Sequence, residues 1–185
     1  MIEIDKKIND INKLVEKNLE IVYYHTSEKF YFFIDGGYKM SSNNQSLAMQ
    51  RIAKLVDENS FMEIGSLVTA RSTDFNLTAA KAPSDGVIIG HGLIDGNLVF
   101  IYSQDATVLN GTIGEMHAKK IASVYDMAMK MGAPVIGFID CGGIRLQESV
   151  DALDGFGLIY AKEVAASGVI PQICGVFGNC GEIGR

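Results

Sequence analysis

The spacing of apolar residues predicts helices in several parts of the chain. In residues 1–24, 47–56 and 115–131, apolar positions recur every three or four residues, which is typical of a helix with one buried face. Gly132 follows the last of these segments and is expected to end it. Residues 146–166 also favour a helix, in which glycines 155 and 157 predict a break.

Short apolar runs between these segments predict strands. Two of them, residues 86–93 and 97–103, are joined by Asp95-Gly96, a strong hairpin signal because both turn positions favour positive φ. Two buried strands and a short extended piece are expected at residues 134–140, 171–176 and 61–68. The order strand, strand, helix, strand, helix, strand predicts an α/β core in which helices cross between neighbouring strands.

Composition narrows the class of protein. A chain of 185 residues with 48% hydrophobic residues can bury the core of one domain. The net charge of −6 argues against nucleic acid or an anionic membrane surface as a partner. Three cysteines without a Cys-x-x-Cys pair argue against a disulfide framework and a zinc ribbon. With no signal peptide and no apolar stretch of about 20 residues, a cytoplasmic protein without membrane insertion is expected.

Two predicted strands end in glycine-bearing loops, GFIDCGGIR at 137–145 and CGVFGNCGEIG at 174–184. In open α/β sheets, ligands bind at the carboxyl ends of strands, and glycine lets backbone N–H groups approach an anion or a thioester oxygen closely. The two loops are therefore candidates for an oxyanion site, although the same spacing fits tight turns without a ligand. Neither loop has the P-loop pattern or the full dinucleotide fingerprint.

Four stretches of the chain carry a resemblance to a known family. They read RIAKLVDENSFMEIG, PSDGVIIGHGLIDGNLVFIYSQDATVLNGTIGEMHAKKI, GAPVIGFIDCGGIRLQES and ASGVIPQICGVFGNCG. From about Leu47 to Gly181 the chain resembles the acyl-CoA carboxyltransferase family. That family includes the carboxyltransferase subunits of biotin-dependent acetyl-CoA and propionyl-CoA carboxylases and of biotin-dependent acyl-CoA decarboxylases.

The resemblance implies a crotonase-like fold of repeated ββα units and a site for coenzyme A thioesters. The reaction would be carboxyl transfer between carboxybiotin, held on a separate carrier, and the α-carbon of an acyl-CoA, with no metal expected. Negative charge develops on the thioester oxygen as an enolate forms, so fixed backbone donors are needed there. By resemblance, the backbone donors are expected at Gly142, Gly143 and Gly181, and the substrate contacts at Arg145, Gly178 and Cys180.

The second loop departs from the family pattern. Where relatives have a glycine pair, this chain has Glu182 and Ile183. A carboxylate there would oppose an enolate, and a β-branched residue is disfavoured at positive φ. The alternative is therefore a truncated or degenerate, non-catalytic acyl-CoA-binding or assembly module. A hydratase or isomerase would instead need a positioned carboxylate, for which Glu148 and Glu182 are candidates.

The resemblance also bears on domains and partners. Residues 40–185 are expected to form part of the N-terminal carboxyltransferase domain, and residues 1–39 an extension outside the resemblance. That extension is either a helical appendage or sequence upstream of a start at Met40. Because family subunits have two crotonase-like halves, the expected partners are a second carboxyltransferase half or subunit and a biotin carboxyl carrier, in an oligomer.

Single residues near the loops have competing interpretations. His117, Lys119 and Lys120 are expected on a solvated helix face rather than in an anion site. Arg145 is expected to orient the glycine loop, to contact a phosphate, or to form a salt bridge with Glu148 or Asp140. Cysteines 141 and 180 are interpreted as small loop residues, since neither has an evident base partner.

Overall fold

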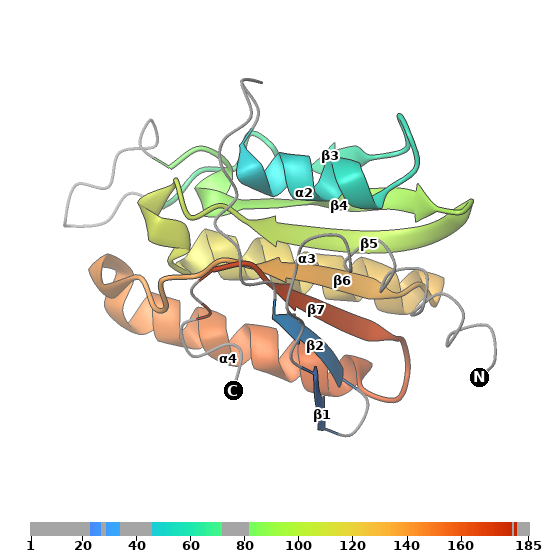
Figure 1. The fold of residues 1–185 in the computed structure, drawn as a ribbon. Coiled ribbons are helices and arrows are strands. Elements are labelled where there is room, and N and C mark those ends of the chain that lie inside the picture. Colours follow the sequence, from blue (N-terminus) through green and yellow to red (C-terminus); the bar gives the residue numbers. More distant parts are fainter. Residues whose placement is uncertain (1–22, 27–28, 34–45, 72–81, 179, 181–185) are drawn as a thin grey trace.

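The computed structural model describes residues 23–26, 29–33, 46–71, 82–178 and 180. These residues form one mixed sheet with the strand order β1-β2-β7-β6-β5-β4-β3 (Figure 1). Strands β2, β7, β6 and β5 run parallel, while the outer pairs are antiparallel. The strands are β1 (Tyr23–Thr26), β2 (Lys29–Phe33), β3 (Met62–Ile64), β4 (Val87–Ile94), β5 (Asn97–Gln104), β6 (Val135–Ile139) and β7 (Gln172–Val176).

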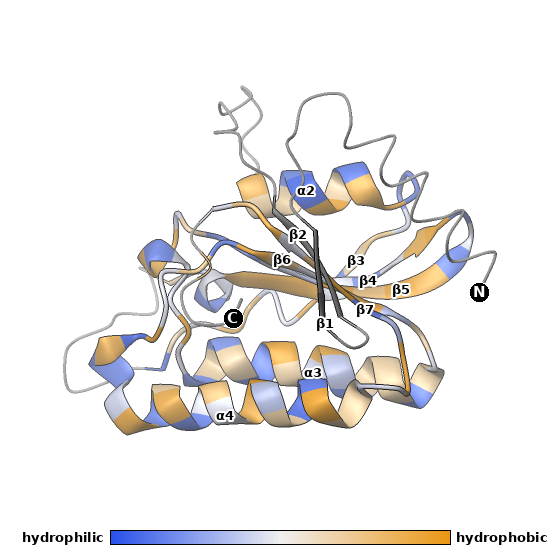
Figure 2. Cartoon of the chain, turned by 60° about the horizontal axis from the view of Figure 1, so that its bottom comes forward, coloured by the Kyte–Doolittle hydropathy of each residue, from blue (hydrophilic) through white to orange (hydrophobic). Residues whose placement is uncertain are grey.

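Helices cover both faces of the sheet. Figure 2 shows α2 (Leu47–Leu55) on one face, and α3 (Glu115–Met131) and α4 (Ser149–Ala166) side by side on the other. Three short 3-10 turns, at Ser84–Gly86, Leu109–Gly111 and Leu146–Glu148, lie between the longer elements. No helix among the described residues is both long and apolar enough to cross a bilayer.

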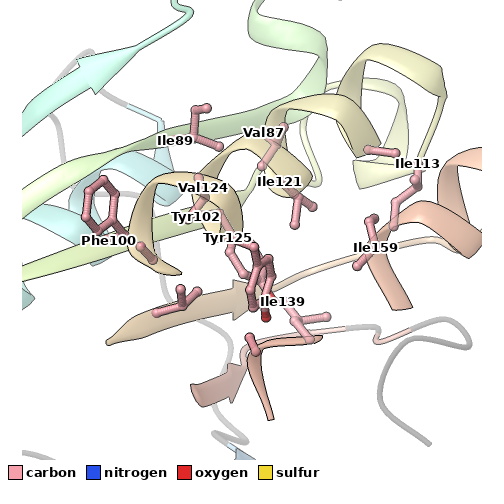
Figure 3. Packing of buried hydrophobic residues seen from close by; sticks show 14 of the residues in the cluster. Val87, Ile89, Phe100, Tyr102, Ile113, Ile121, Val124, Tyr125, Ile139 and Ile159 are labelled. Carbon is pink, nitrogen blue, oxygen red and sulfur yellow. The ribbon is translucent and has the colours of Figure 1, made fainter. Parts of the chain in front are cut away.

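Successive side chains along each strand point to opposite faces of the sheet. Ile88, Ile101 and Phe138 point toward α2 and pack with Ile52 in the smaller of two apolar clusters. Their neighbours along the strands point to the opposite face and pack with α3 and α4 in the larger cluster (Figure 3). This larger cluster includes Val87, Ile89, Phe100, Tyr102, Ile121, Val124, Tyr125, Ile139 and Ile159.

Most of the predicted elements are confirmed. The helix predicted at 115–131 has those bounds, and Gly132 ends it with a φ of 64°. The predicted hairpin joins β4 to β5, with φ values of 49° at Asp95 and 75° at Gly96. The helix at 47–56, the strands at 134–140 and 171–176 and the extended piece at 61–68 are confirmed as α2, β6, β7 and β3.

Two expectations differ from the structure. The break inside 146–166 is wrong, because α4 is continuous through both glycines. Gly155 instead allows α4 to approach α3 closely, since a Cβ at Gly155 would lie 2.8 Å from the Cβ of Ala118. Residues 1–22 of the helix predicted at 1–24 lie outside the described residues. Its last two residues, 23 and 24, belong to strand β1. Part of the segment assigned to the extension thus joins the sheet, where Lys29–Phe33 pairs with β7.

Candidate functional site

The two glycine loops are neighbours at the carboxyl end of the sheet. They follow β6 and β7, which run parallel and side by side, with Ile139 opposite Val176. The N–H of Phe177 donates to the carbonyl of Ile139 at 2.9 Å. Just beyond it, Gly178 lies so close to the Asp140 carboxylate that a Cβ there would overlap it. The loops that the sequence marks as candidates therefore contact each other.

The two glycines of the first loop have different environments. Gly142 donates its N–H to the carbonyl of Asn110 at 2.9 Å, and a Cβ on Gly142 would lie 2.5 Å from the Asn110 side-chain nitrogen. Gly143 has a φ of 101°, and a Cβ there would meet no atom within 4 Å. Its N–H lies 3.2 Å from the sulfur of Cys141, which is a weak acceptor. The N–H of Gly142 is thus committed to a backbone acceptor, whereas Gly143, although buried, has room beside its Cα.

Arg51 connects the two loops from the α2 side of the sheet. Its guanidinium donates to the Asp140 carboxylate at 2.8 Å and lies 4.4 Å from the ring centroid of Phe177. A second donor reaches the backbone carbonyl of Gln104 at 3.4 Å. Sequence reasoning missed Arg51, because nothing in its spacing distinguishes it from a solvated arginine on an amphipathic helix. One guanidinium thereby holds the ends of β5, β6 and β7 together.

Arg145 lies beneath the first loop and is only 1% exposed. Its guanidinium forms salt bridges with Glu148, at 2.8 Å, and with Asp85. It also donates to the carbonyl of Thr112 at 2.7 Å. The expected bridge to Glu148 is confirmed, and the one to Asp140 is wrong, since Asp140 pairs with Arg51. These contacts favour an orienting role for Arg145, and contact with a phosphate stays a prediction.

Glu148 is buried against the start of α3. One carboxylate oxygen pairs with Arg145, and the other accepts a hydrogen bond from the N–H of Glu115 at 2.6 Å. The negative charge thus lies at the positive end of the helix dipole. Both oxygens are engaged, so the geometry gives no support to Glu148 as the acid or base of a hydratase.

The expected solvated face of α3 is wrong at two of its three residues. His117 is completely buried and Lys120 is 4% exposed, while Lys119 lies at the surface and pairs with Glu115. Burial, aided by the nearby charge of Arg145, lowers the pKa of His117 to about 3. Lys120 donates to the carbonyls of Ser84, at 2.9 Å, and of Val87, and burial lowers its pKa to about 8. The sequence position of His117 could have indicated its burial, since it lies one helical turn before the apolar Ile121 on the same face of α3.

The remaining predicted residues are Cys141 in the first loop and residues 180–183 in the second. Cys141 belongs to the larger apolar cluster, against which the partly buried Cys180 packs. Burial raises the pKa of the Cys141 thiol, which disfavours a nucleophilic thiolate. Gly181, Glu182 and Ile183 lie outside the described residues. Within the described part of the chain, no group of three or more His, Cys, Asp or Glu residues is arranged to hold a metal ion.

Curated proteins similar to this chain are subunits of carboxylases and decarboxylases. Methylmalonyl-CoA decarboxylase subunit alpha of Veillonella parvula is 48% identical over 142 residues, covering 77% of this chain and 28% of the relative. Propionyl-CoA carboxylase beta chain of Roseobacter denitrificans is 50% identical over 133 residues, covering 72% of this chain and 26% of the relative. The alignment with the Propionigenium modestum decarboxylase alpha subunit, at 41% identity, covers 95% of the chain and so extends ahead of residue 39. The chain spans about a quarter to a third of the length of these relatives.

Solved structures and a family model agree with these relatives. The transcarboxylase 12S structure, a hexamer with methylmalonyl-CoA bound, matches with a TM-score of 0.69 and 40% identity over 71% of this chain and 26% of that one. A Pseudomonas malonate decarboxylase hetero-tetramer matches with a TM-score of 0.64 and 25% identity, over 72% of this chain and 51% of that one. These neighbours confirm the predicted crotonase-like α/β fold. Since the model for the carboxyl transferase domain matches residues 39–185, the chain belongs to the carboxyl transferase domain family.

Proposed function

We propose that this chain supplies the acyl-CoA side of the site in a cytoplasmic, biotin-dependent acyl-CoA carboxyltransferase or decarboxylase. The observation that carries the proposal is the contact between the two glycine loops at the carboxyl ends of β6 and β7. The Veillonella relative is named for methylmalonyl-CoA and the Roseobacter relative for propionyl-CoA. A short-chain acyl-CoA is therefore the proposed substrate.

The proposed role of the chain is to bind the thioester and to stabilise its enolate. Losing a proton or a carboxyl group from the α-carbon leaves an electron pair that delocalises onto the thioester oxygen. Backbone N–H groups fixed at that oxygen lower the barrier, because they need no reorganisation as the charge develops. Carboxybiotin, when bound, supplies or accepts the carboxyl group, and we assign no residue of this chain to holding it.

Gly143 is the strongest candidate donor in the first loop. The N–H of Gly142 is committed to the carbonyl of Asn110, whereas the N–H of Gly143 faces only a weak sulfur acceptor. The absence of a side chain at Gly143 leaves open space beside its Cα. Gly181 is the proposed second donor, with Gly178 and Cys180 lining the approach of the thioester.

An exposed apolar stripe supports the proposal that the chain works within an assembly. Five large apolar side chains, more than a third exposed, follow the outer side of α4 and the turn before it at spacings of four, three, seven and four residues. Exposed apolar patches of this kind mark interaction surfaces. The proposed partners are a second carboxyltransferase half or subunit and the biotin carboxyl carrier. The stripe consists of Leu146, Val150, Leu153, Tyr160 and Val164.

The second candidate function, a non-catalytic acyl-CoA-binding module, is favoured by one observation. Glu182 and Ile183 replace the glycine pair expected in the second loop. A carboxyl-transfer assay separates the two candidates. Labelled methylmalonyl-CoA and free biotin are incubated with this chain and a complementary second half. The catalytic proposal predicts labelled biotin, which is lost in Gly143→Ala and kept in the matched control Gly157→Ala. Retained binding of the thioester without transfer by the unaltered chain would establish the non-catalytic module instead.

A further inference from the structure

Two buried polar side chains connect the first glycine loop with the turn before β4. Gln104, the last residue of β5, accepts a hydrogen bond on its side-chain oxygen from the N–H of Asp140 at 3.2 Å. Its side-chain nitrogen lies 3.1 Å from Nε2 of His117. Nδ1 of His117 in turn lies 2.8 Å from the carbonyl oxygen of Asp85. Because both Gln104 and His117 are completely buried, no water competes for these contacts.

The chemistry of these groups fixes the direction of each hydrogen bond. The carbonyl of Asp85 only accepts, so Nδ1 of His117 must carry the proton. Nε2 of a neutral imidazole is then an acceptor, and the Gln104 amide nitrogen donates to it. That orientation turns the amide oxygen toward Asp140, where it accepts the backbone N–H. The tautomer of His117 therefore determines which end of the Gln104 amide faces the loop.

The hydrogen bonds from Asp140 through Gln104 and His117 to Asp85 form a relay. Several further contacts hold its Asp85 end in place. The Asp85 carboxylate accepts a hydrogen bond from the backbone N–H of His117 at 2.7 Å and pairs with Arg145. Residues 84, 85 and 86 all have positive φ, at 54°, 49° and 69°. Lys120 holds this turn by donating to the Ser84 carbonyl at 2.9 Å. A rigid turn thus fixes the imidazole, and the imidazole fixes Gln104.

We propose that Gln104 and His117 are positioning residues for the Asp140–Gly143 turn, acting only while His117 is neutral. The proposal deepens the proposed function and rests on it, because Gly143 is the proposed thioester donor in this turn. Gln104 contacts the turn at the Asp140 N–H and at the Cys141 thiol, and His117 acts through Gln104.

A proton on His117 would disrupt the relay. Nε2 would become a donor facing the Gln104 amide nitrogen, so the amide would have to rotate and present its nitrogen to the N–H of Asp140. The cations Arg145 and Lys120 oppose protonation of the ring, and the hydrogen bond from the ring to the backbone carbonyl of Asp85 favours it. Burial and the two cations dominate, so the neutral ring persists at neutral pH.

The test compares two buried glutamines that lie at opposite ends of the sheet. Gln104→Leu removes the relay at the loop end. Gln172→Leu is the matched control, because Gln172 is 6% exposed and begins β7, where its amide donates to the carbonyl of Glu163. Three quantities are measured for each variant: urea stability, amide hydrogen exchange of residues 140–143, and the Kd for propionyl-CoA by calorimetry.

We expect Gln104→Leu to accelerate exchange of the Asp140 amide and to raise the Kd about tenfold, the size of one lost buried hydrogen bond. Gln172→Leu is expected to lower stability comparably while changing both readouts less than about twofold. Equal exchange and equal Kd in the two variants would overturn the proposal. The exchange readout needs no ligand, so it tests positioning even if the unaltered chain fails to bind propionyl-CoA, a failure that would sink the proposed function alone.

Three further variants keep the test decisive if Gln104→Leu fails to fold. Gln104→Glu keeps the acceptor for Asp140 but loses the donor to His117, so its Kd should improve when the pH is lowered enough to protonate the ring. His117→Gln keeps an acceptor near the Nε2 position and should retain most of the affinity, whereas His117→Leu should not. A ¹⁵N spectrum of the unaltered chain should show His117 protonated at Nδ1, and protonation at Nε2 at neutral pH would contradict the relay.

Discussion

Gly155 of α4 lies against Ala118 of α3 so closely that a Cβ at position 155 would be 2.8 Å from the Ala118 Cβ. A Cβ at Gly157, two residues further along the same helix, would meet no atom within 4 Å apart from the nearby backbone of α4 itself. Two glycines of one helix therefore have opposite roles: one permits helix packing, and the other only weakens the helix.

Alanine substitution should separate these roles. Gly155→Ala must push α3 and α4 apart and should lower the free energy of unfolding by about 1–3 kcal/mol. Gly157→Ala should raise it by about 0.5–1 kcal/mol, because alanine loses less backbone entropy in a helix. Urea denaturation of both variants provides the measurement. A change of the same sign in both would contradict this account of the α3–α4 contact.

Stability should fall on mild acidification because of His117. Its pKa is about 3 in the folded chain against 6.5 in the unfolded chain. Above pH 6.5 both states are neutral and the full stability is present. Between pH 6.5 and 3 only the unfolded state takes up a proton, so stability falls by about 1.4 kcal/mol per pH unit from this group.

The control for this prediction is the half-buried His91 of β4. Urea denaturation from pH 7.5 to 4.5 should give a shallower pH dependence in His117→Gln than in the unaltered chain and in His91→Gln. Asp85, Arg145 and Lys120 surround the ring in all three proteins, so the difference isolates the imidazole. Parallel curves for all three would show that His117 is already protonated in the folded state at mildly acidic pH.

Removing Arg145 should be among the most damaging substitutions. Arg145→Leu leaves Asp85 and Glu148 buried without their cation, which costs about 3–5 kcal/mol of stability. The matched control is Arg71→Leu, since Arg71 also bridges two carboxylates, Glu115 and Asp151, but is 55% exposed. Exposed pairs contribute little, so thermal denaturation of that control should be nearly unchanged. Similar melting temperatures for both variants would contradict a structural role for the buried cluster.

A methyl group at Gly178 should disturb the site more than the fold. The new Cβ would displace the Asp140 carboxylate, which holds Arg51 at 2.8 Å. We expect Gly178→Ala to weaken propionyl-CoA binding about tenfold, as for the loss of one charged hydrogen bond. Calorimetry measures this, with Gly157→Ala as the control. Unchanged affinity would mean that the Arg51–Asp140 pair plays no part in binding.

Much of the fold could be predicted from the sequence, because its determinants are local. The α3 helix has a clear apolar period and a glycine at its end, and Asp95-Gly96 alone determines the turn between β4 and β5. Gly155 shows the limit of this approach. A glycine that permits helix contact and one that breaks a helix look the same until the neighbouring helix is known.

The polar framework of the site could not be predicted in this way. Arg51 and Asp140 are 89 residues apart in the sequence, and Asp85 and Arg145 are 60 apart. Charged residues are normally solvated, and the local sequence does not reveal which of them gain a partner that lies far away in the chain. Only the parallel arrangement of β5, β6 and β7 brings their ends together and supplies the partners that make burial tolerable.

The most direct test of the proposed thioester site is a titration of the ¹⁵N-labelled chain with propionyl-CoA, followed by NMR and compared with free coenzyme A. We expect saturable shifts that are largest at the amides of Cys141, Gly143, Gly178 and Cys180, and larger for the thioester than for free coenzyme A. Absence of saturation, or shifts that leave both glycine loops unchanged, would contradict the account.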